Sequence, residues 1–405
     1  VRLWLRFLPA SKYIFIFTIF IPTMSFMKEN ISLAFGLYFM LTAAYASNYG
    51  AYNVYPQGST RAVGMGGGLT ALSDDASGIL FNPAGLAFGK ASFSIDGSNN
   101  PVENTELGTA FTNNSTFQFA AALIRFGDWG LGLGMSSPYV FKGESSTFDP
   151  ITFQSRTLEF EVSVVSGDIV LAKKFDRGFS IGVAGHYEMA TEKFVERDGA
   201  GTAVSDHKEN ETNIYPVVGL SFRGNNYGFG VSYTPLRKID FDENADSNIG
   251  TRTFYRDIEA PEKFTVGFFY NVNRKLMVSV DLDKIGPPKN SILVGTGITG
   301  NSSDTSGDEV AYAESEVSIL HGGIEYKFVE SNANDVTFRI GAYNEPSRVV
   351  SSTFSFTDTV SFNSRMHLTF GIEARIGPVV IGVSFDNAAD FQNSSQALSI
   401  SFGSI

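Results

Sequence analysis

A repeated alternation of apolar residues with small or polar ones constrains the fold of this sequence more than any other feature. In residues 227–233, large apolar side chains take every second position, and Gly228, Gly230 and Ser232 take the positions between them. Residues 129–135, 336–343 and 367–376 repeat this pattern. A period of two is typical of a β-strand whose two faces meet different surroundings. We therefore predict an all-β protein.

The alternation predicts about fourteen strands, near residues 90–98, 115–126, 129–141, 157–174, 178–194, 211–223, 227–240, 251–271, 274–286, 312–328, 335–345, 361–376, 378–387 and 395–403. Short connections, at 127–128, 176–177, 225–226, 271–273, 330–334 and 377, alternate with long polar ones, at 99–114, 142–156, 195–210, 241–250, 287–311, 346–360 and 388–394. A soluble sandwich has no reason to sort its loops in this way, whereas a transmembrane antiparallel β-barrel does. We assign residues 90–405 to such a barrel.

The composition excludes several other classes of protein. Charged residues make up only 18% of the chain, yet the mean hydropathy is +0.01, which does not fit a bundle of membrane helices. The net charge is -12 and no basic stripe is present, so we expect no nucleic-acid partner. The chain has no Cys, and its four His lack nucleophile-elbow or zinc-protease motifs, so we expect no enzyme, metal or cofactor.

The N-terminal residues are expected to act in export. Residues 27–46 combine Lys28, an apolar stretch and the small-residue pattern Ala44-Tyr45-Ala46, which indicates a signal peptide. A second apolar run lies within residues 1–26. We expect translation to begin at Met27; the alternative is one long signal. In either case residues 1–46 are a leader outside the fold.

Residues 47–89 do not alternate and are rich in glycine. A nucleotide-binding loop is excluded, because the Walker and dinucleotide patterns both fail. Two interpretations remain: a glycine-rich structural turn, or a plug held inside the barrel by close backbone packing. The residues that would form this hatch are Gly64, Gly66, Gly67, Asn82, Pro83 and Ala84.

These same residues carry a family resemblance. The Gly64–Gly67 run, Asp74-Asp75 and the Asn82-Pro83-Ala84 tripeptide resemble the N-terminal hatch of FadL/TodX-type outer-membrane transporters of long-chain fatty acids and other hydrophobic compounds. The resemblance implies a monomer in bacterial outer-membrane lipid, with a hatch in the lumen and a small hydrophobic molecule such as a fatty acid as cargo. It also implies a lateral opening at a kinked third strand, where Pro138 is the candidate; the alternative is that Pro138 only ends that strand.

Three basic residues are candidates for meeting a cargo carboxylate: Arg339, Arg375 and His321, which face inward by parity. The alternative is that they pair with inward carboxylates such as Glu325, Glu373 and Asp281. We therefore predict a passive outer-membrane transporter for hydrophobic small molecules. The competing hypothesis, which the hatch motif also allows, is a barrel that shuttles or anchors secreted proteins, as in type IX secretion, without carrying a small molecule.

Overall fold

The computed structural model describes residues 59–99, 109–110, 116–149, 154–241, 256–286, 293–294, 308–312, 317–330, 334–345, 348–351, 359–362, 364–388 and 394–403. The predicted leader, residues 47–58 of the predicted hatch, and most of the predicted long connections lie outside these described residues.

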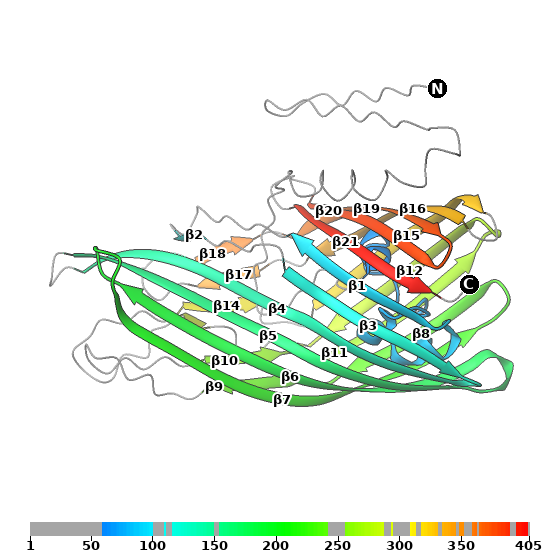
Figure 1. Cartoon of the computed structure of the whole chain (residues 1–405), viewed down its shortest axis with the longest axis horizontal. Coiled ribbons are helices and arrows are strands. Elements are labelled where there is room, and N and C mark those ends of the chain that lie inside the picture. The colour runs from blue at the N-terminus through cyan, green and yellow to red at the C-terminus, as the bar shows by residue number, and fades with distance from the viewer. Residues whose placement is uncertain are drawn as a thin grey trace, which may run out of the picture. The chain divides into compact units, whose positions relative to one another are not determined.

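Fourteen antiparallel strands close into a ring (Figure 1). In ring order they are β1 (Ser92–Asn99), β3 (Thr116–Phe126), β4 (Trp129–Asp149), β5 (Gln154–Lys174), β6 (Phe179–Arg197), β7 (Ala203–Arg223), β8 (Tyr227–Thr234), β11 (Lys263–Asn271), β12 (Leu276–Ile285), β15 (Val317–Glu330), β16 (Asn334–Glu345), β19 (Arg365–Ile376), β20 (Val379–Ala388) and β21 (Ser394–Gly403). Each strand pairs with the next one in this order, and β21 returns to pair with β1. The predicted barrel and its strand number are confirmed.

The remaining strands lie outside this ring order. The strand β2 (Thr109–Ala110) pairs with β4, β9 (Arg237–Phe241) pairs with β10 (Arg256–Ala260), and a small sheet contains β13 (Leu293–Val294), β14 (Asp308–Tyr312), β17 (Arg348–Ser351) and β18 (Thr359–Phe362). The strands predicted over 227–240 and 251–271 are each interrupted, before β9 and after β10 respectively. Pro235 and Pro261 stand at the interruptions, because proline cannot donate a ladder hydrogen bond.

The helices are short. They are α2 (Thr60–Gly64), α3 (Gly78–Phe81) and the 3₁₀ turns η1 (Pro83–Phe88) and η2 (Asp176–Gly178). Among the described residues, no helix has the length and apolar character needed to cross a membrane. The first three belong to residues 59–91, which lie inside the ring and which we call the inner segment (Figure 1).

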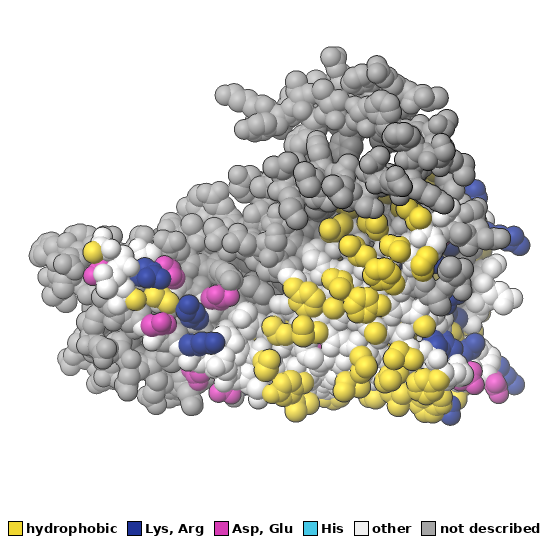
Figure 2. Space-filling view, viewed as in Figure 1, with side chains coloured by type: hydrophobic (Ala, Val, Ile, Leu, Met, Phe, Trp, Pro, Cys, Tyr) yellow, Lys and Arg dark blue, Asp and Glu magenta, His cyan; other side chains and the backbone are white. Residues whose placement is uncertain are grey.

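The ring is apolar outside and polar inside. Outward residues such as Ile169 and Ile340 are 61% and 55% exposed, although they are large and apolar. Their inward neighbours Asp168 and Arg339 are 3% and 4% exposed. Figure 2 shows the apolar side chains gathered over the barrel wall, with charged side chains at either end. An apolar band of this extent would be unfavourable in water and fits a wall that faces lipid.

Tight turns gather at one end of the barrel, which we call the short-turn end. Gly127 and Gly377 turn with φ of 60° and 61°, in the left-handed region where glycine has no side-chain penalty. The connection between β5 and β6 consists of little more than η2. The first residue of β1 and the last residue of β21 lie at this same end of the barrel. The predicted short connections among the described residues are therefore confirmed.

Two of the predicted long connections are wrong. Residues 142–156 and 195–210 are mostly strand, because β4 and β5 have 21 residues each, β6 has 19 and β7 has 21. About ten tilted residues suffice to cross a membrane, so these four strands are longer than a crossing requires, and in Figure 1 they run well past the other strands of the ring. Polar residues misled the prediction there, because a strand with water on both faces need not alternate. Asp198 turns the chain between β6 and β7 by accepting hydrogen bonds from the backbone of Ala200 and Thr202.

Candidate functional site

The inner segment lies against a wall of inward-facing glycines. A Cβ at Gly182 would overlap the backbone of Pro83 and Ala84, and one at Gly219 would overlap the side chain of Asn82. Gly230, Gly323 and Gly341 are approached as closely by other parts of the segment. Glycine is thus required at these positions by the close approach of two backbones.

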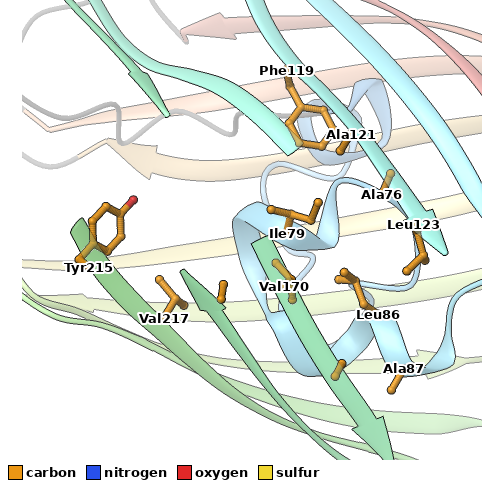
Figure 3. Packing of buried hydrophobic residues seen from close by; sticks show 12 residues of the cluster. Ala76, Ile79, Leu86, Ala87, Phe119, Ala121, Leu123, Val170, Tyr215 and Val217 are labelled. Carbon is orange, nitrogen blue, oxygen red and sulfur yellow. The ribbon is translucent and has the colours of Figure 1, made fainter. Parts of the chain in front are cut away.

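Apolar packing holds the part of the segment that contains α3 and η1. Ile79, Leu86 and Ala87 share a buried cluster with Leu123 of β3 and Val170 of β5, and Figure 3 shows these side chains converging. Full burial of an aliphatic side chain contributes about 1.5–3 kcal/mol. The cluster therefore binds this part of the segment to the wall without using charge.

The predicted tripeptide Asn82-Pro83-Ala84 attaches the segment to β6 and β7. Nδ2 of Asn82 donates to the carbonyl of Leu220 at 3.0 Å and to that of Thr70 at 2.9 Å, while its Oδ1 accepts from the amide of Ala84 at 3.1 Å. The hydroxyl of Ser180 donates to the carbonyl of Ala84 at 2.9 Å. The Asn82 side chain is fully buried, so loss of its partners would leave polar groups unsatisfied.

The predicted glycine run lies against β12, β15 and β19. Gly66 and Gly67 have φ of 63° and 86°, which turns the chain directly after α2. The carbonyl of Gly66 accepts from Nδ1 of His321 at 2.7 Å, and the carbonyl of Gly64 accepts from Thr369 at 3.3 Å. Just beyond, the amide of Thr70 donates to Asp281, 2.6 Å away. His321, a candidate for meeting cargo, thus contacts the segment itself.

A chain of alternating charges ties the segment to the wall on both sides. Asp74 accepts from Arg223 of β7 and from Arg61 of α2, with both N–O distances 2.7 Å. The chain continues from Arg61 to Glu325 of β15 at 3.3 Å, and from Glu325 to Arg339 of β16 at 2.8 Å. Arg339 also pairs with Glu373 of β19 at 2.9 Å.

The charge of Asp74 is fixed by this arrangement. Burial alone would raise the pKa of Asp74, but the guanidinium groups of Arg223 and Arg61 outweigh burial and hold the pKa well below its usual range. Burial likewise works against the charge of Arg61, yet the neighbouring Glu325, Asp74 and Asp75 raise the pKa of its guanidinium. Both partners therefore stay ionised at neutral pH.

The three candidates for meeting a cargo carboxylate occupy different surroundings. Arg339 is 4% exposed and is held between Glu325 and Glu373. His321 lies 3.4 Å from Asp283 in addition to its bond with the segment. Arg375 is partly exposed, pairs with Asp335 at 3.3 Å and lines a cavity of about 430 Å³ that Arg339 also borders.

Sequence reasoning missed a cluster on the other side of the lumen. Nδ1 of His186 lies 2.7 Å from Asp168, and its ring stacks on Tyr215 with centroids 4.8 Å apart. Arg237 of β9 donates to Glu188 and to the Tyr215 hydroxyl, both at 2.7 Å. Asp168, His186 and Tyr215 are register partners across β5, β6 and β7, so correct strand pairing would have found them. Nε2 of His186 is buried without a hydrogen-bond partner among the described residues.

A second stack of rings lies across β15, β16 and β19. Tyr343 stacks on His367 at 4.5 Å and on His321 at 5.7 Å. His367 lies between Asp386, 2.8 Å from Nδ1, and Glu345, 2.9 Å from Nε2. Within the described part of the chain, no three His, Asp or Glu side chains are arranged to hold a metal ion. Their chemistry is that of a buried hydrogen-bonded network.

The described ladder between β3 and β4 ends beside Pro138, and β4 is paired again with β2 at Glu144 and Ser145. The β3–β4 ladder runs from Phe126↔Trp129 to Phe119↔Ser136 and stops there, although β4 continues to Asp149. The β4–β5 register also shifts between Ser136 and Tyr139. Ser136 is buried inward and donates to Asp168, so the interruption adjoins the cluster around His186.

No protein-family model matches the sequence, and no curated protein matches it. Solved structures do match. The barrel of a Pseudomonas aeruginosa FadL homologue covers 87% of this chain and 99% of its own, with 13% identity and a TM-score of 0.56. The Ralstonia pickettii toluene transporter TbuX covers 86% and 99%, with 14% identity and a TM-score of 0.55. The Pseudomonas putida toluene transporter TodX covers 89% and 98%, with 13% identity and a TM-score of 0.52. The chain therefore has the barrel fold of FadL- and TodX-type proteins.

Proposed function

We propose that this protein is a passive channel of the bacterial outer membrane for small hydrophobic molecules, such as long-chain fatty acids. One observation carries the proposal: a lipid-facing ring encloses a polar lumen that the inner segment occupies. Water-soluble cargo needs an open aqueous lumen, whereas apolar cargo gains from a route that avoids water. Transport of toluene by the structural neighbours TbuX and TodX supports the same class of cargo.

In this proposal the inner segment acts as the hatch, formed around Gly64, Gly66, Gly67, Asn82, Pro83 and Ala84. The short-turn end faces the periplasm, because barrels of this kind place short turns there and long loops outside. His321 holds the segment through Gly66. Arg339 is held between the wall carboxylates Glu325 and Glu373, so in this proposal neither basic residue is left to meet a cargo carboxylate. Arg375, at the cavity surface, is the remaining candidate for contacting a cargo carboxylate.

The exit route we propose leads sideways through the wall beside Pro138. The end of the β3–β4 ladder at Ser136 supports it, because between Ser136 and Glu144 the described strands show no ladder pairing on this edge of β4, and a weakly paired stretch of wall can admit an apolar molecule directly to lipid. Proline at this position cannot supply a donor to restore the ladder. The lumenal cluster around His186 lies at the same level and offers polar partners to a cargo headgroup.

Uptake by cells tests the function. A strain that lacks the gene, with and without a plasmid copy, would be given labelled oleate and labelled toluene. We expect the plasmid to restore uptake of at least one. A secretion defect without any change in uptake would contradict the channel and support the shuttle or anchor for secreted proteins.

An engineered disulfide tests the lateral exit separately. The chain has no Cys, so Gln118→Cys with Ser137→Cys creates the only pair, placed where the ladder stops. Its control is Ala121→Cys with Gly134→Cys, a register pair within the intact ladder. We expect oxidation to reduce uptake only in the first pair. Equal uptake in the oxidised and reduced forms of the first pair would refute the lateral route.

A further inference from the structure

A second cavity, of about 330 Å³, lies between the inner segment and the short-turn end, and its lining is strongly basic. Two acidic side chains, Asp74 and Glu325, face five basic ones: Arg61, Arg223, Arg274, Lys275 and Lys327. The chain as a whole carries a net charge of -12, so this excess of positive charge runs against the composition. A local excess of one sign in a concave site concentrates ions of the other sign.

One arginine of this lining is fixed in position by two aromatic rings. The guanidinium of Arg223 lies between the rings of Phe88 and Phe269, at 4.9 and 5.5 Å from their centroids. Its Nε is buried and has no hydrogen-bond partner among the described residues. Arg274 and Lys275, at the mouth, form no ion pair within the described part of the chain. The site therefore has unused capacity for an anion.

The carboxylate of Asp74 shows which anion fits. One of its oxygens accepts from Arg61 and the other from Arg223, so a single carboxylate spans the two guanidinium groups. Planar guanidinium groups suit carboxylates through paired, charge-assisted hydrogen bonds. Asp74 reaches this position from the inner segment, not from the barrel wall.

We propose that this cavity is a carboxylate-binding site in which Asp74 is the built-in occupant. A free monocarboxylate, or the carboxylate end of an amphiphile, binds at Arg223 and the neighbouring lysines in competition with Asp74. Binding of this ligand weakens the attachment of the inner segment to β7, because Arg223 is shared. The site is defined by equilibrium binding at the short-turn end and does not rest on the transport proposal.

Titration of the purified full chain in detergent with ¹³C-labelled hexanoate tests this site, with binding followed by NMR. Asp74→Asn removes the competing charge, so we expect hexanoate to bind about tenfold tighter or more than to the unaltered protein. Arg223→Gln and Lys327→Gln should each weaken binding about tenfold or more. Lys208→Gln, on the exposed extension of β7, is the matched control and should leave the affinity unchanged.

Two results would overturn the proposal. The first is that Asp74→Asn binds hexanoate no more tightly than the unaltered protein. The second is that Arg223→Gln, which keeps Asp74 and changes only a residue of the barrel wall, binds hexanoate with unchanged affinity. Inorganic phosphate and decanoate complete the series. Decanoate should bind as hexanoate does or more tightly, and phosphate that displaces hexanoate at equal concentration would refute the assignment to carboxylates. The hexanoate affinities expected here stay the same if the protein proves not to transport oleate.

Discussion

Replacing Gly182 with alanine should displace the inner segment while leaving the barrel intact. The new Cβ would lie within 3.0 Å of backbone atoms of Pro83 and Ala84, a separation that real Cβ atoms essentially never show. Backbone cannot rotate away as a side chain can, so the segment itself must move. Overpacking of this kind costs about 1–3 kcal/mol.

The movement also strains the hydrogen bonds that anchor this part of the segment. Ser180 donates to the carbonyl of Ala84, and Asn82 donates to that of Leu220. Each such bond contributes about 0.5–1.5 kcal/mol. Together with the overpacking, we expect the seated state to lose about 2–6 kcal/mol, which raises the displaced population by about 30-fold or more.

Gly185→Ala provides a matched control on the same strand. A Cβ at Gly185 would meet no atom within 4 Å, so the same chemical change there should be neutral. Both variants would be reconstituted in planar bilayers, where single-channel conductance reports an unblocked lumen. Limited proteolysis of residues 59–91 reports the segment, and heat-modifiable electrophoretic mobility confirms that the barrel has folded. Equal conductance and equal proteolysis in the two variants would refute the close-packing argument.

Two further predictions concern the wall and the charged contacts. Phe268→Arg, on the outward face of β11, should destabilise the folded barrel by about 2–4 kcal/mol if that site lies near the membrane midplane, and should lower the yield of folded barrel. The control Asn226→Arg, in a short turn, should leave this yield unchanged. Equal yields of the two variants would contradict a lipid-facing wall. Because the pKa of Asp74 is lowered, its contribution to holding the segment should be fully present above the ordinary carboxyl pKa of about 4 and should decline as the pH falls below it. Protease protection of the segment should therefore differ between the unaltered protein and Asp74→Asn from pH 7 to pH 5. The difference should begin to shrink below about pH 4 and should vanish only as the pH falls through the lowered pKa of Asp74. A difference that already vanishes at pH 6 would rule out this ion pair as the cause.

Most of the barrel could be predicted from local pattern. The alternation in residues 227–233 corresponds to β8, where Gly228, Gly230 and Ser232 face inward and are buried. The parity of Arg339 and His321 was also sufficient to place them inside. Alternation reports which face is which because neighbouring residues of a strand point to opposite sides, and this holds whatever the strand pairs with.

The alternation failed to predict strands where the two faces of a strand do not meet different surroundings. The extensions of β4 to β7 are rich in polar residues and show no regular alternation, so their residues were interpreted as loops. The cluster of Asp168, His186 and Tyr215 was missed because it depends on the register between three strands. Register is set by how strands pair across turns, and a one-residue shift would separate these side chains.

The sequence by itself determined the alternating faces, the tight turns and the glycine-rich inner segment, because each depends on residues close together in the chain. The tertiary structure alone decided which groups meet in the lumen. Asp74 pairs with Arg223, 149 residues away, and Thr60 bonds to Ser399 across 339 residues, because closing the ring brings distant strands around one segment. Such contacts leave no trace in local periodicity, since any inward carboxylate or hydroxyl would satisfy the same pattern.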